Sequence, residues 1–131
     1  MNKIVIVDDS RTLRVQLRVR LEEEGFEVLE AEDGMLGYEL VKENQDCRLI
    51  LSDVNMQGMD GISMLEELNK NEVLPNIGVV VLTTETSQRL KDRGKKAGVN
   101  VWFSKPLSKD RLEILVGLIY KLIKKLENTS S

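Results

Sequence analysis

Acidic, hydroxyl and amino side chains follow four short apolar runs of this 131-residue chain, each at the point where the run ends. The carboxyl ends of parallel strands meet at one edge of a sheet, so these side chains would lie together if the runs are parallel strands. Taken singly, each is an ordinary loop residue, and only their joint placement carries a prediction. The residues are Asp8 and Asp9, Asp53, Thr83 and Thr84, and Lys105.

Three carboxylates in one crevice favour a bound metal ion. At ~5 Å and an effective dielectric of ~20, each pair of carboxylates repels by roughly 3 kcal/mol. A divalent cation relieves this repulsion, and so does proton uptake by a carboxyl group with a raised pKa. Because the chain has no histidine and its donors are hard oxygens, Mg²⁺ is the favoured ion.

The same residues suit the transfer of a phosphoryl group. Lys105 offers a positive charge and Thr83 offers a hydroxyl donor. Together with a metal ion, they could neutralise the charge on a moving phosphoryl group from several sides. A carboxylate acting as the nucleophile would then form an aspartyl phosphate.

The composition is that of a soluble globular domain, with 41% apolar and 31% charged residues. A net charge of −3 without a dense Lys/Arg block argues against general nucleic-acid binding. No signal peptide and no apolar run long enough to span a membrane are found in the sequence. The single cysteine, Cys47, cannot form an internal disulfide, which favours the cytoplasm, and we interpret it as a small core or boundary residue and not a reactive thiol.

Short β-branched runs alternate with longer helical patterns along the whole chain. Three runs, IVIV, LIL and VVVL, are continuously apolar, which is typical of a parallel strand that is covered on both faces. We predict strands at residues 3–7, 27–31, 48–52, 78–82 and 99–103.

The intervening segments predict five helices. Leucines 13, 17 and 21 form the apolar stripe of the first helix, which Gly25 can end. Polar residues can cap the other four helices at their amino ends: Asp33, Asp60, either Thr86 or Ser87, and Ser108. On the last helix, Ile114 and Leu118 lie off the main stripe, so they belong either to a partner surface or to a wide core face.

Five βα units with short connections predict an α/β fold, a doubly wound five-stranded parallel sheet with right-handed crossovers. We expect one domain over residues 1–127 and a disordered tail over residues 128–131.

Four segments, VDDS, LSDVNMQGMDG, VLTTET and WFSKP, resemble the response-regulator receiver family. The match runs from about residue 3 to residue 126. The resemblance implies the flavodoxin-like (βα)5 fold with strand order 2-1-3-4-5. It also implies that Asp53 accepts the phosphoryl group.

The resemblance further assigns the metal ligands. It implies that Asp9, Asp53 and the backbone carbonyl of Asn55 bind Mg²⁺ directly, while Asp8 acts through a bound water. Asn55 and Glu85 occupy the two positions that tune dephosphorylation in the family. Glu85 could instead be an ordinary charge at the start of a helix.

The remaining family roles concern the switch. The resemblance implies that the Thr83 hydroxyl, the Thr84 N–H and Lys105 contact the phosphoryl group, and that the Lys105–Pro106 peptide bond is cis. Trp102 occupies the position of the switch aromatic residue, although a partly buried core residue is an alternative interpretation.

These features predict a single-domain response regulator and not an enzyme acting on external substrates. The resemblance implies a sensor histidine kinase as donor and a downstream protein target, such as a flagellar motor switch protein in chemotaxis, with a phosphatase as a further candidate partner. We expect no nucleic acid, no membrane insertion, and a monomer or a weak phosphorylation-dependent dimer.

Other functions remain as alternatives. The receiver could serve a phosphorelay or another pathway outside chemotaxis. A small phosphatase with Asp53 as nucleophile would want a second acid where Asn55 stands. A flavin carrier would want a phosphate loop after the first strand, where Asp8 and Asp9 would repel phosphate. A receiver fold without phosphorylation would not need the complete residue set.

Overall fold

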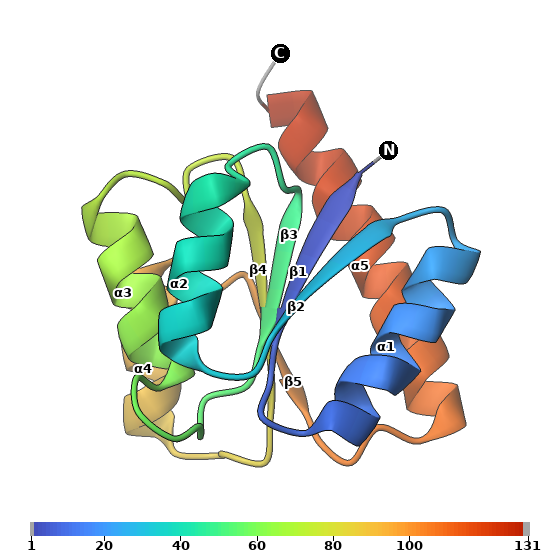
Figure 1. Cartoon of the computed structure of the whole chain (residues 1–131), viewed down its shortest axis with the longest axis horizontal. Helices are drawn as coiled ribbons and strands as arrows, with labels where there is room; N and C mark the ends of the chain where they lie inside the picture. The colour runs from blue at the N-terminus through green and yellow to red at the C-terminus, as the bar shows by residue number, and fades with distance from the viewer. Residues whose placement is uncertain (1, 130–131) are drawn as a thin grey trace.

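A computed structural model describes residues 2–129 as a five-stranded parallel sheet in the order β2-β1-β3-β4-β5 with five helices (Figure 1). The predicted fold class and strand order are confirmed. Strands and helices alternate along the chain as β1 (Lys3–Val7), α1 (Arg11–Glu23), β2 (Glu27–Ala31), α2 (Gly34–Glu43), β3 (Leu49–Ser52), α3 (Gly61–Lys70), β4 (Gly78–Thr83), α4 (Gln88–Ala97), β5 (Val101–Ser104) and α5 (Lys109–Thr129).

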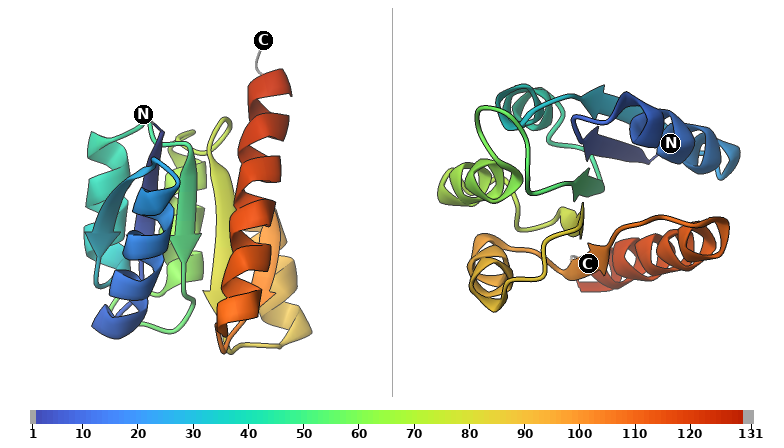
Figure 2. Two further views of the ribbon diagram at one scale, coloured as in Figure 1. Left: turned by 90° about the vertical axis from the view of Figure 1, so that its right-hand side faces the viewer. Right: turned by 90° about the horizontal axis from the view of Figure 1, so that it is seen from below.

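Two apolar cores lie on the opposite faces of the sheet. Ile4 and Ile6 of β1 pack in the core that also contains residues of α1 and α5, while Val5 and Val7 pack in the core with residues of α2, α3 and α4. Successive side chains of a strand point to opposite faces, so a strand buried on both sides must be apolar throughout. Figures 1 and 2 show the two helical layers on either side of the strands.

The predicted caps hold the amino ends of the helices. The carboxylates of Asp33 and Asp60 accept hydrogen bonds from backbone N–H groups at 2.9 and 2.8 Å. Ser87, and not Thr86, caps α4, and Ser108 accepts a hydrogen bond from the N–H of Arg111. These caps satisfy N–H groups that have no partner within the helix, and they fix where each connection leaves the sheet.

Several predicted boundaries differ from the structure: β3 begins at residue 49 and not 48, β4 ends at residue 83 and not 82, and β5 ends at residue 104 and not 103. Two further differences have a visible cause. Strand β5 begins at Val101 because Asn100 pairs with Val79 through both its backbone N–H and its side-chain oxygen, each at 2.8 Å. Helix α5 continues to Thr129, so residues 128 and 129 are helical and do not form the predicted tail. Leu126 packs against the core and supports this extension. The rest of the predicted tail, residues 130–131, lies outside the described residues.

Burial bears on two of the sequence-based interpretations, and helix length and hydropathy bear on a third. On α5, Ile114 is 57% exposed whereas Leu118 packs against the core. Cys47 is buried, and burial raises the pKa of its thiol to about 11, which fits a core residue and not a reactive thiol. Across residues 2–129, every helix is too short or too polar to span a bilayer.

Candidate functional site

The three predicted acids meet at the carboxyl edge of the sheet, which is the lower edge in Figure 1. Asp8 and Asp9 follow β1, and Asp53 follows the neighbouring strand β3. One carboxylate oxygen from each acid lies within 4.8 Å of the other two. Asp8 and Asp53 are only 2% and 8% exposed, while Asp9 is open to solvent.

Lys105 lies between the two buried acids. Its Nζ donates hydrogen bonds to Asp8 Oδ2 at 3.0 Å and to Asp53 Oδ2 at 2.9 Å. Burial alone would lower the pKa of Lys105, but the bonds to Asp53 and Asp8 outweigh it and raise that pKa. One cation against three carboxylates leaves two negative charges of the cluster uncompensated.

Burial raises the pKa of Asp8, although two contacts oppose the shift. The N–H of Ser10 donates to Asp8 Oδ1 at 2.8 Å, and Lys105 donates to the other oxygen. In Asp53, Oδ1 accepts the N–H of Val54 at 2.6 Å. Among residues 2–129, the Asp9 carboxylate has no hydrogen-bond partner, so its oxygens are free to bind a ligand.

This donor set fits Mg²⁺. Carboxylate oxygens are hard ligands, two of the acids are already fixed by hydrogen bonds, and the exposed Asp9 leaves the cluster open on one side. A pocket of about 380 Å³ beside Asp9 is lined by further acidic and polar residues, namely Glu32, Asp33 and Gln57.

The hydroxyl and amide groups of the predicted switch lie at the end of β4 and in the loop that follows it. Thr83 ends β4 and is fully buried, and its hydroxyl oxygen accepts the N–H of Glu85 at 3.2 Å. The carbonyl of Thr83 accepts the N–H of Lys105 at 2.9 Å, which joins the ends of β4 and β5. Thr84 is exposed, and the Lys105–Pro106 peptide bond is cis as predicted.

Glu85 connects three of the predicted residues. Its carboxylate accepts a hydrogen bond from the side chain of Asn55, and its carbonyl accepts one from Trp102 Nε1 at 3.0 Å. Its N–H is the group bonded to Thr83. Trp102 is therefore half-buried against the core and also tied to the loop, which is more than a core role alone requires.

The indole of Trp102 lies against a glycine of α4. A Cβ atom at Gly94 would come within 3.1 Å of Trp102 Cζ3 and within 3.3 Å of Ile62 Cδ1. Gly94 therefore leaves the space that the large aromatic side chain occupies.

Sequence reasoning missed a second glycine at the site. A Cβ at Gly61 would lie 1.9 Å from the carbonyl oxygen of Asp53, so only glycine allows this close approach. The N–H of Gly61 also donates to the carbonyl of Val54 at 2.9 Å. The helix-opening sequence Asp60-Gly61 was visible, but its packing against Asp53 was not.

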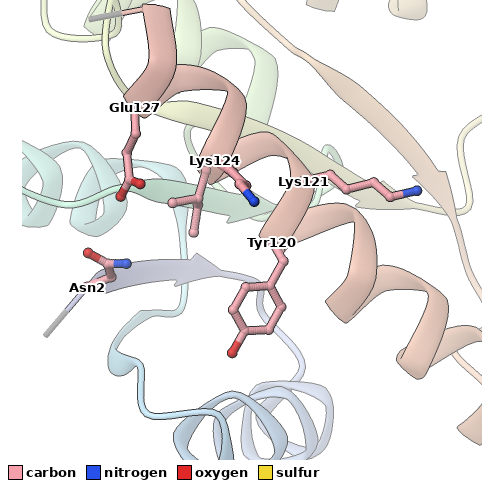
Figure 3. A pocket seen from close by; sticks show the side chains of 6 residues that line it. Asn2, Tyr120, Lys121, Lys124 and Glu127 are labelled. Atoms are coloured by element: carbon pink, nitrogen blue, oxygen red, sulfur yellow. The ribbon is translucent and has the colours of Figure 1, made fainter. Parts of the chain in front are cut away.

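A second hollow, of about 490 Å³, lies against α5 at the opposite end of the sheet (Figure 3). None of the predicted site residues lines it. Its walls come from Asn2, Tyr120, Lys121, Ile123, Lys124 and Glu127. This hollow is therefore separate from the predicted site at the carboxyl edge.

Comparison with known proteins decides the family. Residues 4–116 match the family model of the response regulator receiver domain. This chain belongs to the response regulator receiver family. As a receiver domain it is a signalling protein and not a classical enzyme, and its acidic pocket is of the kind that binds Mg²⁺ in the family.

Curated relatives cover most of the receiver. It is 32% identical to the chemotaxis protein CheY1 of Helicobacter pylori over 88% of this chain and 97% of that protein. It is 33% identical to the protein PilH of Pseudomonas aeruginosa over 86% of this chain and 92% of that protein.

Solved receiver structures superpose closely. A CheY-like receiver domain protein from Methanospirillum hungatei gives a TM-score of 0.88 at 26% identity and covers 98% of each chain. The chemotaxis protein CheY4 of Vibrio cholerae gives a TM-score of 0.81 at 30% identity and covers 91% of this chain and 98% of its own. The beryllofluoride-activated NtrC4 receiver domain dimer gives 0.82 at 25% identity, over 96% of this chain and 99% of its own.

Proposed function

We propose that this receiver is a single-domain response regulator that accepts a phosphoryl group on Asp53 from the phosphohistidine of a sensor histidine kinase. One observation carries the proposal. Oxygens of Asp8, Asp9 and Asp53 lie within 4.8 Å of one another, and Lys105 bonds two of these acids. Such a cluster is costly for the fold, so a functional reason is the simplest account of it.

In the proposed reaction, an oxygen of Asp53 forms a bond to phosphorus while the phosphorus–nitrogen bond of the donor breaks. The electron pair of that bond returns to the imidazole of the kinase. Asp9, Asp53, the carbonyl of Asn55 and, through water, Asp8 would hold Mg²⁺, which supplies positive charge against the phosphoryl oxygens. Lys105 is already placed to add a second positive charge.

The switch would follow from the new charge. A phosphoryl group adds about −1.5 to −2 charges. It would draw in Lys105, the Thr83 hydroxyl and the Thr84 N–H. When Thr83 turns toward phosphate, it gives up its hydrogen bond with Glu85, and Glu85 is also bonded to Trp102. The loop and the indole would therefore move together.

Asn55 and Glu85 would tune the lifetime of the phosphorylated state. The two side chains are hydrogen-bonded to each other, and they come from the loops after β3 and β4 that flank Asp53. In this position they would govern how a water molecule reaches the phosphoryl group.

The output would be binding of a protein to the face made by α4, β5 and α5. Two shallow hollows of about 220 and 240 Å³ share Asn100 on this face. Their walls combine apolar side chains with lysines from both helices: Lys91, Lys95, Val99, Trp102, Val101, Leu118, Leu122, Lys121 and Lys125. This combination favours an acidic, amphipathic target.

We propose chemotaxis as the pathway, with a CheA-like kinase as donor, a flagellar motor switch protein as target and a phosphatase as a further partner. All would meet the receiver in the cytoplasm. The names of the CheY relatives support this. The printed name of the PilH relative does not mention chemotaxis, so a phosphorelay or another pathway remains the alternative. A weak dimer on phosphorylation is supported by the NtrC4 neighbour, which was solved as an activated dimer.

The test uses Trp102, the only tryptophan of the chain, as a reporter. We expect its fluorescence to change when Mg²⁺ is added with beryllofluoride or acetyl phosphate, and the acetyl phosphate reaction to give a labelled protein. Asp53→Asn should abolish labelling, while the matched variant Asp46→Asn, at a surface acid that pairs with Lys3, should label normally.

Two results would contradict the proposal. One is the absence of Mg²⁺-dependent labelling in the wild type, or labelling that survives Asp53→Asn. The other is fast, Asp53-dependent hydrolysis of an external phosphomonoester, which would establish the phosphatase alternative.

A further inference from the structure

Arg14 of α1 reaches back to the loop that carries the acids. Its Nη1 donates a hydrogen bond to the backbone carbonyl of Asp8 at 2.6 Å. Its Nε donates to Glu30 Oε1 of β2 at 2.9 Å, and the side chains of this pair are 13% and 18% exposed. Arg18, one turn further along α1, pairs with the other carboxylate oxygen of Glu30. The guanidinium group of Arg14 thus bonds Glu30 on one side and the Asp8 carbonyl on the other.

These contacts fix the backbone on both sides of Asp8. The N–H of Asp8 donates to the carbonyl of Ala31 at 3.1 Å, and Ala31 is the neighbour of Glu30 on β2. The carbonyl of Asp8 belongs to the planar peptide unit that leads into Asp9. Arg14 therefore sets the orientation of that plane, and with it the direction in which Asp9 leaves the loop.

Asp9 needs such support more than the other acids do. The Asp8 and Asp53 carboxylates have hydrogen bonds of their own, whereas that of Asp9 has no partner within residues 2–129. Its position depends on its backbone alone.

We propose that Arg14, braced by Glu30, is a positioning residue that holds the Asp8–Asp9 turn in the geometry that binds Mg²⁺. This rests on the proposed function, because it takes the acidic cluster as the metal site. In the described structure, the only group of the cluster that Arg14 bonds is the Asp8 carbonyl. Its charge would repel an incoming cation, so its benefit to metal binding must be geometric.

The sign of the effect separates three roles for Arg14. A positioning role predicts that Arg14→Met weakens Mg²⁺ binding. A purely electrostatic role predicts tighter binding, because a nearby positive charge is removed. A role in fold stability alone predicts a lower melting temperature with unchanged Mg²⁺ affinity.

The experiment is calorimetric titration of the metal-free receiver with magnesium chloride, together with thermal melts in EDTA. We expect Arg14→Met to bind Mg²⁺ about tenfold more weakly, the scale found when a residue that orients a metal ligand is removed. Arg18→Met is the matched control. Arg18 lies on the same helix as Arg14 and pairs with the same acid, Glu30, but it has no contact with the Asp8 carbonyl. We expect its affinity to stay near that of the wild type.

Arg14→Lys keeps the charge and provides a second variant in case Arg14→Met does not fold. One ammonium group cannot reproduce the two-ended guanidinium contact, so we expect it also to bind Mg²⁺ more weakly. Wild-type or tighter affinity in a folded Arg14 variant would overturn the positioning role alone. A wild-type receiver that does not bind Mg²⁺ would overturn the proposed function as well.

Discussion

At the scale of single residues, the acidic cluster combines a buried carboxylate, that of Asp8, with an exposed one, that of Asp9. Asp8 is 2% exposed, and burial raises its pKa against the opposing contacts of Ser10 and Lys105. Asp9 is exposed and has its oxygens available. The buried acid supplies a fixed wall of the site, and the exposed one supplies the open side.

The raised pKa of Asp8 predicts a change in stability. A carboxyl group whose folded pKa exceeds its unfolded value, here 3.8, stabilises the fold below that value, and the benefit is lost as the pH rises through the folded pKa. At about pH 7 without Mg²⁺, Asp8→Asn should raise the free energy of unfolding by about 1 kcal/mol, because it removes a charge that is costly to bury, and this cost exceeds the lost attraction to Lys105. Urea unfolding in EDTA measures this difference.

The gain should shrink as the pH is lowered toward 3.8, because the raised pKa of Asp8 leaves more of the wild-type carboxyl group protonated there. Asp92→Asn, at an exposed acid of α4, should show little change at either pH. An Asp8→Asn variant that is less stable than the wild type at neutral pH would show that the ion pair with Lys105 outweighs the cost of burying the Asp8 charge.

The sequence predicts which residues lie together because they follow neighbouring strands. It does not predict contacts that a long side chain makes with a different element. Asp8, Asp53 and Lys105 could be placed because each directly follows a strand. The contact of Arg14 with Glu30 depends on β2 lying beside β1, and an arginine of an amphipathic helix is usually a solvated charge. Nothing in the local pattern separates it from Arg18.

At the scale of elements, α3 and α4 differ in how firmly they attach to the sheet. Helix α3 buries Gly61, Ile62, Met64, Leu65 and Leu68, whereas α4 buries only Gly94 and Ala97. Apart from these residues and the partly buried Leu90, α4 is polar, and it follows the loop that contains Glu85. The helix beside the switch is thus the one with less apolar surface to hold it.

This contrast predicts faster hydrogen exchange in α4 than in α3. Local opening requires less free energy where fewer apolar side chains must leave the core. Exchange measured by mass spectrometry or NMR on the metal-free receiver should show lower protection across Gln88–Ala97 than across Gly61–Lys70. Equal protection would indicate that the two helices open only with the whole domain.

Helix starts were predicted more accurately than strand and helix ends. Asp33, Asp60 and Ser108 are capping residues with a local signature, and the structure uses all three. The start of β5 depends on Asn100, whose side chain takes a place in the pairing with Val79, and this tertiary contact has no local signal. The length of α5 likewise depends on Leu126 reaching the core.

At the scale of the whole molecule, chemistry and binding are assigned to adjoining regions. The acids lie at the carboxyl edge of the sheet, and the proposed output face lies over α4, β5 and α5. Lys105 and Trp102 belong to the same short segment at β5, which joins the two regions.

Mg²⁺ should stabilise the folded receiver as a unit. A ligand present at about 100 times its Kd, and bound only by the folded state, adds about 2.7 kcal/mol, which is about 8–10 °C in Tm for a domain of this size. Thermal melts with magnesium chloride measure the shift, and sodium chloride of equal ionic strength is the control. An Asp9→Asn variant should lose most of the shift, and a wild-type Tm that ignores Mg²⁺ would contradict the metal site.

The close packing of Gly94 on Trp102 links the size of the side chain at position 102 to the stability of helix α4. A glycine inside a helix is about 1 kcal/mol less favourable than alanine. Helix α4 accepts that weakness because a Cβ at residue 94 would press on the indole at 3.1 Å. A smaller aromatic residue at position 102 would remove the tightest of the three contacts that alanine at position 94 would make, the other two being with Ile62 and Val99 at 3.3 Å. The size of the aromatic residue at position 102 therefore limits which residue can stand at position 94, and through it the local stability of α4.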